Sequence, residues 1–575
     1  MRAYSCMRFL FALAGIYAAL ESVNCEAQVA SPSQVTPQSL RPNIPSSSTS
    51  IRLSEQGSLV APAGSDKLNV LVGQVVVEGA FDELADTVEP YLVRLRGNRL
   101  SVAEIYSIAT AIEKAYSEYG FILARVSIPP QQLTDNGRLT IVVTDGFIEQ
   151  VDASSLDEKI RAIVLRRTNL LVGRRHIRLS EIERCLLIAA DTPGLKLKST
   201  LARGDANGGA KLVLDGYYDM LVVSGGTDNR QPASLGSWQL RGSFALNSTL
   251  GFGEQIYGTI TSSAVLPAAL EENSPLRIVG GGVVVPLGDR GLSINPEVTH
   301  SVTQTKAQPS IPATVGTFDR LAFRIKSPLI WTRSETLNVT GGIEYNQQNL
   351  VVPQFGMKLY ADEYGAMRIG ADYATSLKWG ANLQVAGNAS FGFSGRSAED
   401  VALSGVPLSR MGASSEFTKL NANGRYTQPF SDVLRMDLIA AGQFSFNKAM
   451  LRSEQFSLDG PDALSAFSAG TFSVDQGATL RTEVTRTFAI QFDGKQVAVL
   501  PYVFGSVGRG WLVNVTAVEQ SLINAGSAGV GIRTSVDNKG TFSSFNLGLE
   551  LARQFSDVLG LERGWRGNVN AAVTF

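Results

Sequence analysis

Residues Gly564 to Phe575, G-W-R-G-N-V-N-A-A-V-T-F, alternate between an apolar and a polar face. The apolar face carries Trp565, Val569, Val573 and Phe575, and the other face carries mainly arginine, asparagine and threonine. Alternation with a period of two predicts a β-strand with one apolar and one polar side. A strand of this kind ending on an aromatic residue is typical of the closing strand of a membrane β-barrel, although a soluble sandwich could end in the same way.

The whole composition favours the barrel. The chain has 575 residues, 56 glycines, a charged fraction of only 18% and a formal net charge of −1, so no nucleic-acid-binding surface is indicated. It contains no apolar run of 18 or more residues that could form a spanning helix. In a membrane barrel only alternate residues face lipid, which explains the near-neutral mean hydropathy.

The alternation recurs between residues 216 and 575, for example in 337–346, 434–446 and 545–551. With about 20–24 residues for each strand and its connection, this region predicts roughly 15–18 strands, and we expect about 16. The pattern predicts a transmembrane antiparallel β-barrel with a polar lumen. The alternative is a tandem of exported soluble β-sandwiches.

Cysteine and histidine are too scarce to support a catalytic or metal site. Cys6 and Cys25 lie in the amino-terminal segment, which leaves Cys185 alone in the expected mature chain, and the only histidines are His176 and His300. A disulfide framework, a metal centre and histidine-dependent catalysis are therefore poorly supported. We expect no enzyme, no cofactor and no metal, and Cys185 is expected to be a buried small side chain.

The first 66 residues predict export followed by a linker. Residues 1–27 have a basic start, a short apolar core and a small residue at the expected cleavage point, which together indicate a signal peptide. Residues 28–66 are rich in Ser, Pro and Gln and show no helical or strand period, so they predict a disordered linker. No convincing amphipathic helix is present there to fill a barrel.

Residues 67–145 predict a compact α/β unit. Two helices are expected at 81–95 and 101–119, and Ser101 with Glu104 forms a capping box at the start of the second helix. The expected strands are 70–77, 124–128 and 138–144.

Residues 146–215 repeat the same order of elements. Strands are expected at 147–151, 195–202 and 210–214, a helix at 156–170, and a second helix opened by a Ser180/Glu183 capping box. Two tandem β-α-α-β-β units before a barrel define the expected fold class, an α+β repeat region followed by the barrel.

This organisation resembles the POTRA-barrel superfamily, and two repeats resemble the TpsB transporters of two-partner secretion, the hemolysin-activator family. Short motifs carry the same resemblance; they are Leu186-Leu187-Ile188, Asp191, Pro193-Gly194, Leu201 and Gly208 in the second repeat, and Asp228-Asn229-Arg230, Asn247, Leu250-Gly251 and Glu254-Gln255 in the first barrel hairpin.

The resemblance implies a location and a function. The barrel would lie in outer-membrane lipid with two periplasmic POTRA domains, residues 67–145 and 146–215. The domains would bind an unfolded β-rich exoprotein of the TpsA type, hemolysin-like or adhesin-like, and the barrel would export it to the cell surface. No P-loop is present, so ATP hydrolysis by this chain is not expected to drive export. The alternatives are an assembly factor for outer-membrane proteins and a passive porin.

The resemblance also implies a lock between a pore loop and the wall. The family's Val-Arg-Gly-Tyr/Phe tetrad aligns with Leu464, Ser465, Ala466 and Phe467, and its F-x-D-x-G motif aligns with Phe504, Ser506 and Gly508. Both charged partners are thus replaced by serine. A Ser465–Ser506 contact, direct or through water, would hold the loop more weakly than an ion pair.

Two further sets of residues are assigned to partners. The client could add as a strand to sheet edges, represented by Arg138, Thr140 and Val142 in one repeat and Lys211 and Val213 in the other. The final strand, with Trp565, Val569, Val573 and Phe575, resembles the signal that outer-membrane proteins present to the barrel assembly machinery, which they reach with periplasmic chaperones.

Overall fold

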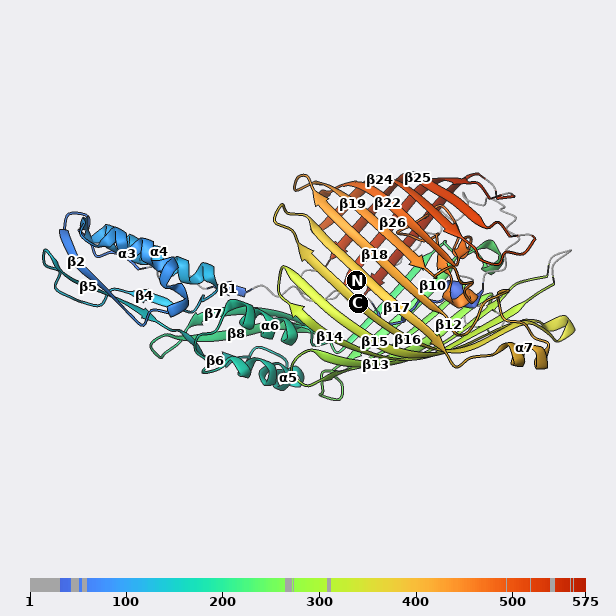
Figure 1. The fold of residues 1–575 in the computed structure, drawn as a ribbon, viewed down its shortest axis with the longest axis horizontal. Coiled ribbons are helices and arrows are strands. Elements are labelled where there is room, and N and C mark those ends of the chain that lie inside the picture. The colour runs from blue at the N-terminus through green and yellow to red at the C-terminus, as the bar shows by residue number, and fades with distance from the viewer. Residues whose placement is uncertain are drawn as a thin grey trace.

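In the computed structural model, two small α/β repeats lie end to end beside one mouth of a wide β-barrel (Figure 1). The structure describes residues 31–42, 51–53, 59–263, 271, 274–307, 312–492, 494–517, 519–537, 543–558, 560–561 and 563–575. The expected signal peptide, residues 1–27, lies outside the described residues. No described helix is long and apolar enough to cross a membrane.

The first repeat packs two helices on a four-stranded sheet of order β3-β2-β5-β4. Its elements are β2 (Asn69–Glu78), η1 (Asp82–Leu84), α3 (Ala85–Leu95), β3 (Arg99–Ser101), α4 (Val102–Tyr119), β4 (Arg125–Ser127) and β5 (Gly137–Thr144). The Ser101 side chain accepts a hydrogen bond from the Glu104 N–H, and Gly120 ends α4 in the left-handed conformation. The expected helices and the capping box are confirmed.

The second repeat has the same architecture. Its elements are β6 (Phe147–Asp152), α5 (Glu158–Thr168), η2 (Asn169–Leu171), α6 (Leu179–Ala190), β7 (Leu195–Arg203) and β8 (Gly209–Tyr218). The expected Ser180/Glu183 box is wrong, because α6 begins two residues earlier with Arg178 as its N-cap. Glu181 lies three residues after Arg178, and its carboxylate accepts the Arg178 N–H at 3.4 Å.

The prediction that residues 28–66 form a disordered linker is wrong for two described segments. Residues 31–42, which include the short helix α2 (Pro32–Val35), lie inside the barrel, where Gln34 donates to the Ser473 hydroxyl. Strand β1 (Ile51–Leu53) adds in parallel to β7, at one edge of the β1-β7-β8-β6 sheet. Composition missed both segments, because their order comes from partners elsewhere in the chain rather than from a core of their own.

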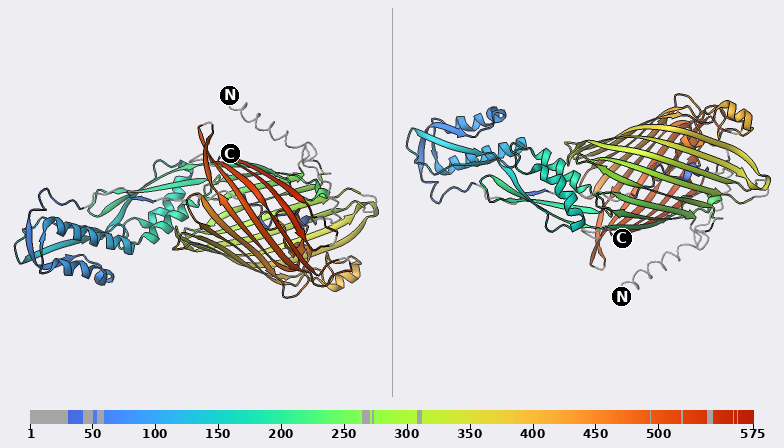
Figure 2. Two further views of the ribbon diagram at one scale, coloured as in Figure 1. Left: turned by 90° about the horizontal axis from the view of Figure 1, so that it is seen from above. Right: turned by 90° about the horizontal axis from the view of Figure 1, so that it is seen from below.

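The barrel is closed and antiparallel, with sixteen strand positions among the described residues because β22 and β23 follow one another along β24. Its strands are β9 (Leu221–Asp228), β10 (Gln239–Asn247), β11 (Gln255–Ser263), β12 (Leu276–Leu287), β13 (Leu292–Gln304), β14 (Val315–Trp331), β15 (Glu335–Val352), β16 (Met357–Ser376), β17 (Asn382–Phe393), β18 (Thr418–Pro429), β19 (Leu434–Phe444), β22 (Gln476–Arg486), β23 (Phe488–Phe492), β24 (Lys495–Trp511), β25 (Leu522–Asp537), β26 (Ser544–Ser556) and β27 (Trp565–Thr574). The strands cross the barrel obliquely (Figure 2), as closure of a sheet requires.

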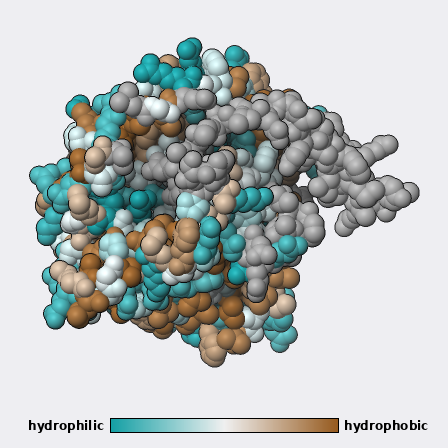
Figure 3. All heavy atoms as spheres, turned by 90° about the vertical axis from the view of Figure 1, so that its right-hand side faces the viewer, coloured by the Kyte–Doolittle hydropathy of each residue, from teal (hydrophilic) through white to brown (hydrophobic). Residues whose placement is uncertain are grey.

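The two faces of each strand differ as the alternation predicts. In β15, Ile343 is 56% exposed on the outer face, whereas the neighbouring Glu344 is 8% exposed and points into the lumen. Seen from the end opposite the repeats, hydrophilic and hydrophobic residues are intermingled around the rim (Figure 3). The alternation along the strands, as at Ile343 and Glu344, gives the barrel an apolar outer wall and a polar, charged lumen.

Candidate functional site

The lumen holds a long segment that we call the lumen loop, residues 445–475, between β19 and β22. Two short strands, β20 (Phe456–Ser457) and β21 (Ser473–Val474), pair within it. Its buried apolar side chains pack against the wall residues Tyr502 and Phe504; they are Leu458, Leu464, Phe467, Phe472 and Val474. The structure thus places the tetrad Leu464–Phe467 in a folded insert against the strands that carry Phe504 and Ser506.

Arg481 of β22 anchors this loop from the wall. Its Nη1 donates to Ser465 Oγ at 2.6 Å, its Nε to Glu483 Oε1 at 2.7 Å and its Nη2 to Glu550 Oε2 at 2.8 Å. The guanidinium carbon lies 3.7 Å from the centre of the Phe504 ring. The Arg481 side chain is fully buried. Through its charge-assisted hydrogen bonds, its guanidinium joins the lumen loop to β22 and β26.

Of the two expected forms of the Ser465–Ser506 contact, the direct one is wrong, and the one through water stays a prediction. The Ser506 hydroxyl lies 2.6 Å from the Ser527 hydroxyl on the neighbouring strand, and Ser465 is bound by Arg481 instead. In the ladder between β22 and β24, Arg481 lies directly opposite Ser506. The Arg481 guanidinium therefore lies beside position 506, where the family has an aspartate. This positive charge belongs to the barrel wall and not to the lumen loop.

Gly508 lets the loop approach the wall. A Cβ atom at this position would lie 3.0 Å from Leu464 Cδ1, tighter than nine in ten real Cβ contacts, so the Leu464 side chain would have to shift. Glycine thus lets Leu464 pack close to β24.

The polar face of the last strands ties down the loop backbone. Gln554 Nε2 donates to the Ala466 carbonyl and Asn568 Nδ2 to the Ser465 carbonyl, both at 2.7 Å. Arg566 Nη1 also donates to the Ser468 hydroxyl. The alternation in Gly564–Phe575 placed Arg566 and Asn568 on the polar face, but it could not say that they contact a loop about 100 residues away.

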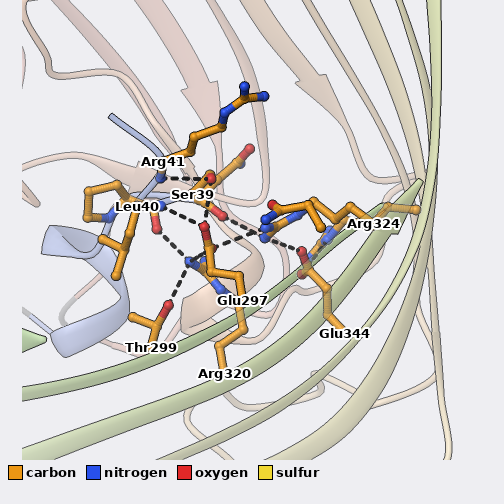
Figure 4. A network of polar contacts seen from close by, with 12 residues as sticks. Ser39, Leu40, Arg41, Glu297, Thr299, Arg320, Arg324 and Glu344 are labelled. Carbon is orange, nitrogen blue, oxygen red and sulfur yellow. Dashed lines mark hydrogen bonds and ion pairs between the residues drawn. The ribbon is translucent and has the colours of Figure 1, made fainter. Parts of the chain in front are cut away.

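A second group of wall charges was missed at the sequence level. Glu297 pairs with Arg324 at 3.1 Å, and Arg324 pairs with Glu344 at 3.0 Å (Figure 4). Arg368 then joins Glu344 to Glu454 of the lumen loop, each at 2.7 Å. We call this row the charge network. Each wall charge, taken alone, is ordinary for the polar face of an alternating strand. No local sequence pattern therefore indicated that these charges form a connected network.

The expected client-binding edges are only partly available. Strand β8, with Lys211 and Val213, lies between β7 and β6, so the expectation of a free edge there is wrong. Strand β5, with Arg138, Thr140 and Val142, pairs with β2 along one side, and β4 covers only its last three residues on the other. Both backbone groups of Thr140 are bonded to the Gln131 side-chain amide at 2.8 Å.

The final strand closes the barrel against β9. Phe575 N–H donates to the Val223 carbonyl at 2.8 Å, and Val223 N–H donates to the Phe575 carbonyl at 3.2 Å. Trp565 and Phe575 are each 60% exposed on the outer side, whereas Val569 is buried. The aromatic residues of the expected assembly signal are thus accessible.

The described residues contain no group of three or more His, Cys, Asp or Glu side chains placed to hold a metal ion. Cys185 Sγ donates to the Arg167 carbonyl at 2.9 Å, and burial raises the pKa of its thiol to about 11. The thiol is therefore a poor nucleophile.

Comparison with known proteins agrees with this architecture. The family model described as haemolysin secretion/activation protein ShlB/FhaC/HecB matches residues 215–567, and that of the ShlB-type POTRA domain matches residues 70–146. The heme/hemopexin transporter protein HuxB of Haemophilus influenzae strain 86-028NP is 22% identical over 468 residues, which cover 80% of this chain and 79% of HuxB.

Solved structures share the fold. CdiB from Escherichia coli has a TM-score of 0.66 at 17% identity and covers 95% of this chain and 94% of its own. CdiB from Acinetobacter baumannii has a TM-score of 0.58 at 13% identity, covering 100% and 98%. The chain belongs to the ShlB/FhaC/HecB family of haemolysin secretion/activation proteins, the outer-membrane transporters of two-partner secretion with periplasmic POTRA domains.

Proposed function

We propose that this transporter exports one unfolded, β-rich exoprotein of the TpsA type from the periplasm, through the barrel lumen, to the cell surface. The observation that carries the proposal is the filling of the lumen. Two segments of the chain itself, the lumen loop and residues 31–42, are held to the wall by hydrogen bonds and ion pairs as well as by apolar packing. The polar contacts can exchange with those of another polypeptide that enters the lumen.

The POTRA domains would supply the first contact with the client. Between Arg138 and Ile141, β5 is paired with β2 on one side and is not reached by β4 on the other. An extended client could add there as a strand if the Gln131 side chain moves away from Thr140. The residues we assign to this surface are Arg138 and Thr140; Val142, which was also expected there, is already paired with Ser127 of β4.

The driving force would come from the client. The sequence has no P-loop, and the transporters of this family are not enzymes, so we assign this chain no catalytic role. Folding of the client outside the cell would prevent its return. The barrel itself would be inserted into lipid by the assembly machinery with periplasmic chaperones, through Trp565, Val569, Val573 and Phe575.

The proposal is tested by comparing the secreted and surface proteins of cells with and without the transporter. Loss of one large exported protein, with the other outer-membrane barrels unchanged, is the expected result. Broad loss of outer-membrane proteins would instead identify an assembly factor, and no change in either set would identify a porin. Complementation with the Arg486→Met variant, which alters an exposed arginine at the end of β22, should restore export.

A further inference from the structure

The wall of the barrel holds residues 37–40 chiefly by their main chain. Arg320 Nη2 donates to the Pro37 carbonyl and Arg324 Nη2 to the Gln38 carbonyl, both at 2.9 Å. Thr259 Oγ1 donates to the Leu40 carbonyl at 3.1 Å, and the Leu40 N–H donates to Glu297 Oε2 at 3.0 Å. Four backbone groups in four residues are thus recognised by side chains from β11, β13 and β14 (Figure 4).

One side chain of the segment occupies a shaped pocket. Leu40 is 5% exposed and packs among Ala245, Tyr257, Leu276, Ile278 and Val284. A Cβ atom on Gly280 would lie 2.3 Å from the Val298 carbonyl oxygen and 2.5 Å from Leu40 Cδ1, so glycine leaves room both for the neighbouring strand and for this leucine. The site therefore accepts an extended backbone together with one aliphatic side chain.

The wall groups remain paired without the segment. Glu297 also binds Arg324 at 3.1 Å, Arg320 at 3.3 Å and the Tyr257 hydroxyl at 2.7 Å. Arg320 also donates to Thr299 Oγ1 at 3.2 Å. Because these charges neutralise one another, the site can be vacated without leaving a lone buried charge.

One buried donor is still free to bind a ligand. Arg320 is 7% exposed, and its Nε has no hydrogen-bond partner among the residues that the structure describes. A further carbonyl of an extended chain could accept this hydrogen bond.

We propose that Glu297, Arg320, Arg324 and Thr259 form a lumenal binding site for the main chain of an extended polypeptide in transit, and that residues 37–40 occupy it when the transporter is at rest. The inference rests on the proposed function only in naming the exported client as the second occupant. Main-chain recognition suits a client whose successive segments differ in sequence, because every residue except proline offers the same N–H and C=O groups.

The test uses the full chain lacking residues 31–42, in detergent, and a fluorescent synthetic peptide of residues 36–42, T-P-Q-S-L-R-P. The peptide should bind. N-methylation of its Leu40 amide should weaken binding about tenfold or more, because a charge-assisted hydrogen bond is lost. The peptide with Gln38→Ala, which alters an exposed side chain and keeps every main-chain group, is the matched control and should bind with unchanged affinity.

The wall is tested in the same assay. The Arg320→Met/Arg324→Met double variant should lose peptide binding by at least tenfold. The Arg533→Met variant removes a lumenal arginine that pairs with Glu483 on another part of the wall, and it should bind the peptide normally. Equal binding of the N-methylated and the Gln38→Ala peptides, or equal binding of the peptide to the two wall variants, would overturn the proposal.

The heat-dependent gel mobility of the barrel shows whether the chain lacking residues 31–42 has folded. If it has not, a second measurement on the intact chain tests the site. This measurement uses the intact chain with Ser39→Cys as the labelled position and Cys185→Ala to remove the other thiol. A thiol reagent should label the cysteine at position 39 several times faster when Arg320→Met/Arg324→Met is added than when Arg533→Met is added. Equal labelling would contradict the site. Peptide binding without export in cells would preserve the site and reject the proposed function, whereas export without peptide binding would do the reverse.

Discussion

At the scale of single residues, Arg481 decides how the lumen loop is held. Its guanidinium joins Ser465 to Glu483 and Glu550 in a fully buried position. Arg481→Met should destabilise the barrel by roughly 3–5 kcal/mol, because the buried Glu550 carboxylate loses its cationic partner, whereas Glu483 keeps Arg533. The loop should then become sensitive to protease, and the conductance in planar bilayers should rise.

The matched control for this prediction is Arg486→Met, at the exposed end of the same strand. It should leave the unfolding midpoint, the protease pattern and the conductance unchanged. If Arg481→Met behaved like Arg486→Met in all three measurements, Arg481 would not be the anchor.

Ser465 and Ser506 can be tested by restoring the family's charged pair. Ser465→Arg alone would place a second guanidinium beside Arg481, whose Nη1 lies 2.6 Å from the Ser465 hydroxyl, and like charges should release the loop. Ser506→Asp, opposite Arg481 in the strand ladder, should compensate. We expect high conductance for the single variant and, for the Ser465→Arg/Ser506→Asp variant, conductance below that of the parent.

This pair of variants also addresses the hypothesis that the loop is held less firmly here than in relatives. The hypothesis would be wrong if the double variant matched the parent in secretion, conductance and protease sensitivity of the loop.

At the scale of secondary-structure elements, Gln131 protects part of the outer edge of β5. Its side-chain amide makes both hydrogen bonds that a neighbouring strand would make to Thr140. Gln131→Ala should speed hydrogen exchange of the Thr140 amide about fivefold, as expected for the loss of a hydrogen bond worth about 1 kcal/mol. The control is Gln132→Ala, which alters the adjacent exposed amide; the same acceleration in both variants would show that Gln131 gives no specific protection.

The contact between the two POTRA domains should depend on pH. His176 Nε2 and Arg178 Nη2 of the second domain each lie 3.2 Å from a carboxylate oxygen of Glu83 in η1. The hydrogen bond from His176, followed by that from Arg178, lowers the pKa of Glu83 below its usual 4.5. A lowered carboxyl pKa favours the ionised form in the contact, so the stabilisation is present above pH 4.5 and is lost as the pH falls through the lowered value.

Distances between spin labels on α3 and α5 would measure this effect. We expect a narrow distribution at pH 7 that broadens under more acidic conditions, and a broad distribution at every pH for Glu83→Gln. Glu89→Gln, which removes an exposed carboxylate paired with Arg96 in the first domain, should behave like the parent. A narrow distribution for Glu83→Gln at pH 7 would contradict the role of Glu83.

At the scale of the whole molecule, the charge network connects the two segments that fill the lumen. It leads from Glu297, which binds residues 39 and 40, through Arg324, Glu344 and Arg368 to Glu454 of the lumen loop. Glu454 is buried and also pairs with Lys419 at 2.9 Å. Glu454→Gln should therefore weaken the packing of both segments, at a cost of roughly 3–5 kcal/mol.

Two readouts separate coupling from a local effect. Protease cleavage would report the lumen loop, and thiol labelling of a Ser39→Cys/Cys185→Ala background would report residues 31–42. Asp462→Asn is the control, because Asp462 pairs with Arg425 at an exposed position of the loop. If Glu454→Gln released the loop but left labelling at position 39 unchanged, the network would not connect the two segments.

Local sequence patterns predicted most of the strands and helices and which of their faces are apolar. Alternation in residues 337–346, 434–446 and 545–551 placed strands β15, β19 and β26, because the period of two is a local property of a half-buried strand. Ser101 with Glu104 marked the start of α4 for an equally local reason. The polar face of the last strand also followed from the sequence pattern, whereas the approximate position of the lumen loop came from the family resemblance.

Which residues contact one another depends on the three-dimensional fold. Arg481 contacts Ser465, Glu550 and Phe504 because barrel closure and strand tilt bring four separate segments to one point, and neither can be read from a local pattern. Strand order likewise placed β8 inside its sheet and left the outer side of β7 to β1. Residues 31–42 are ordered because the wall satisfies their backbone groups, and a segment that borrows its partners from a distant surface carries no pattern of its own.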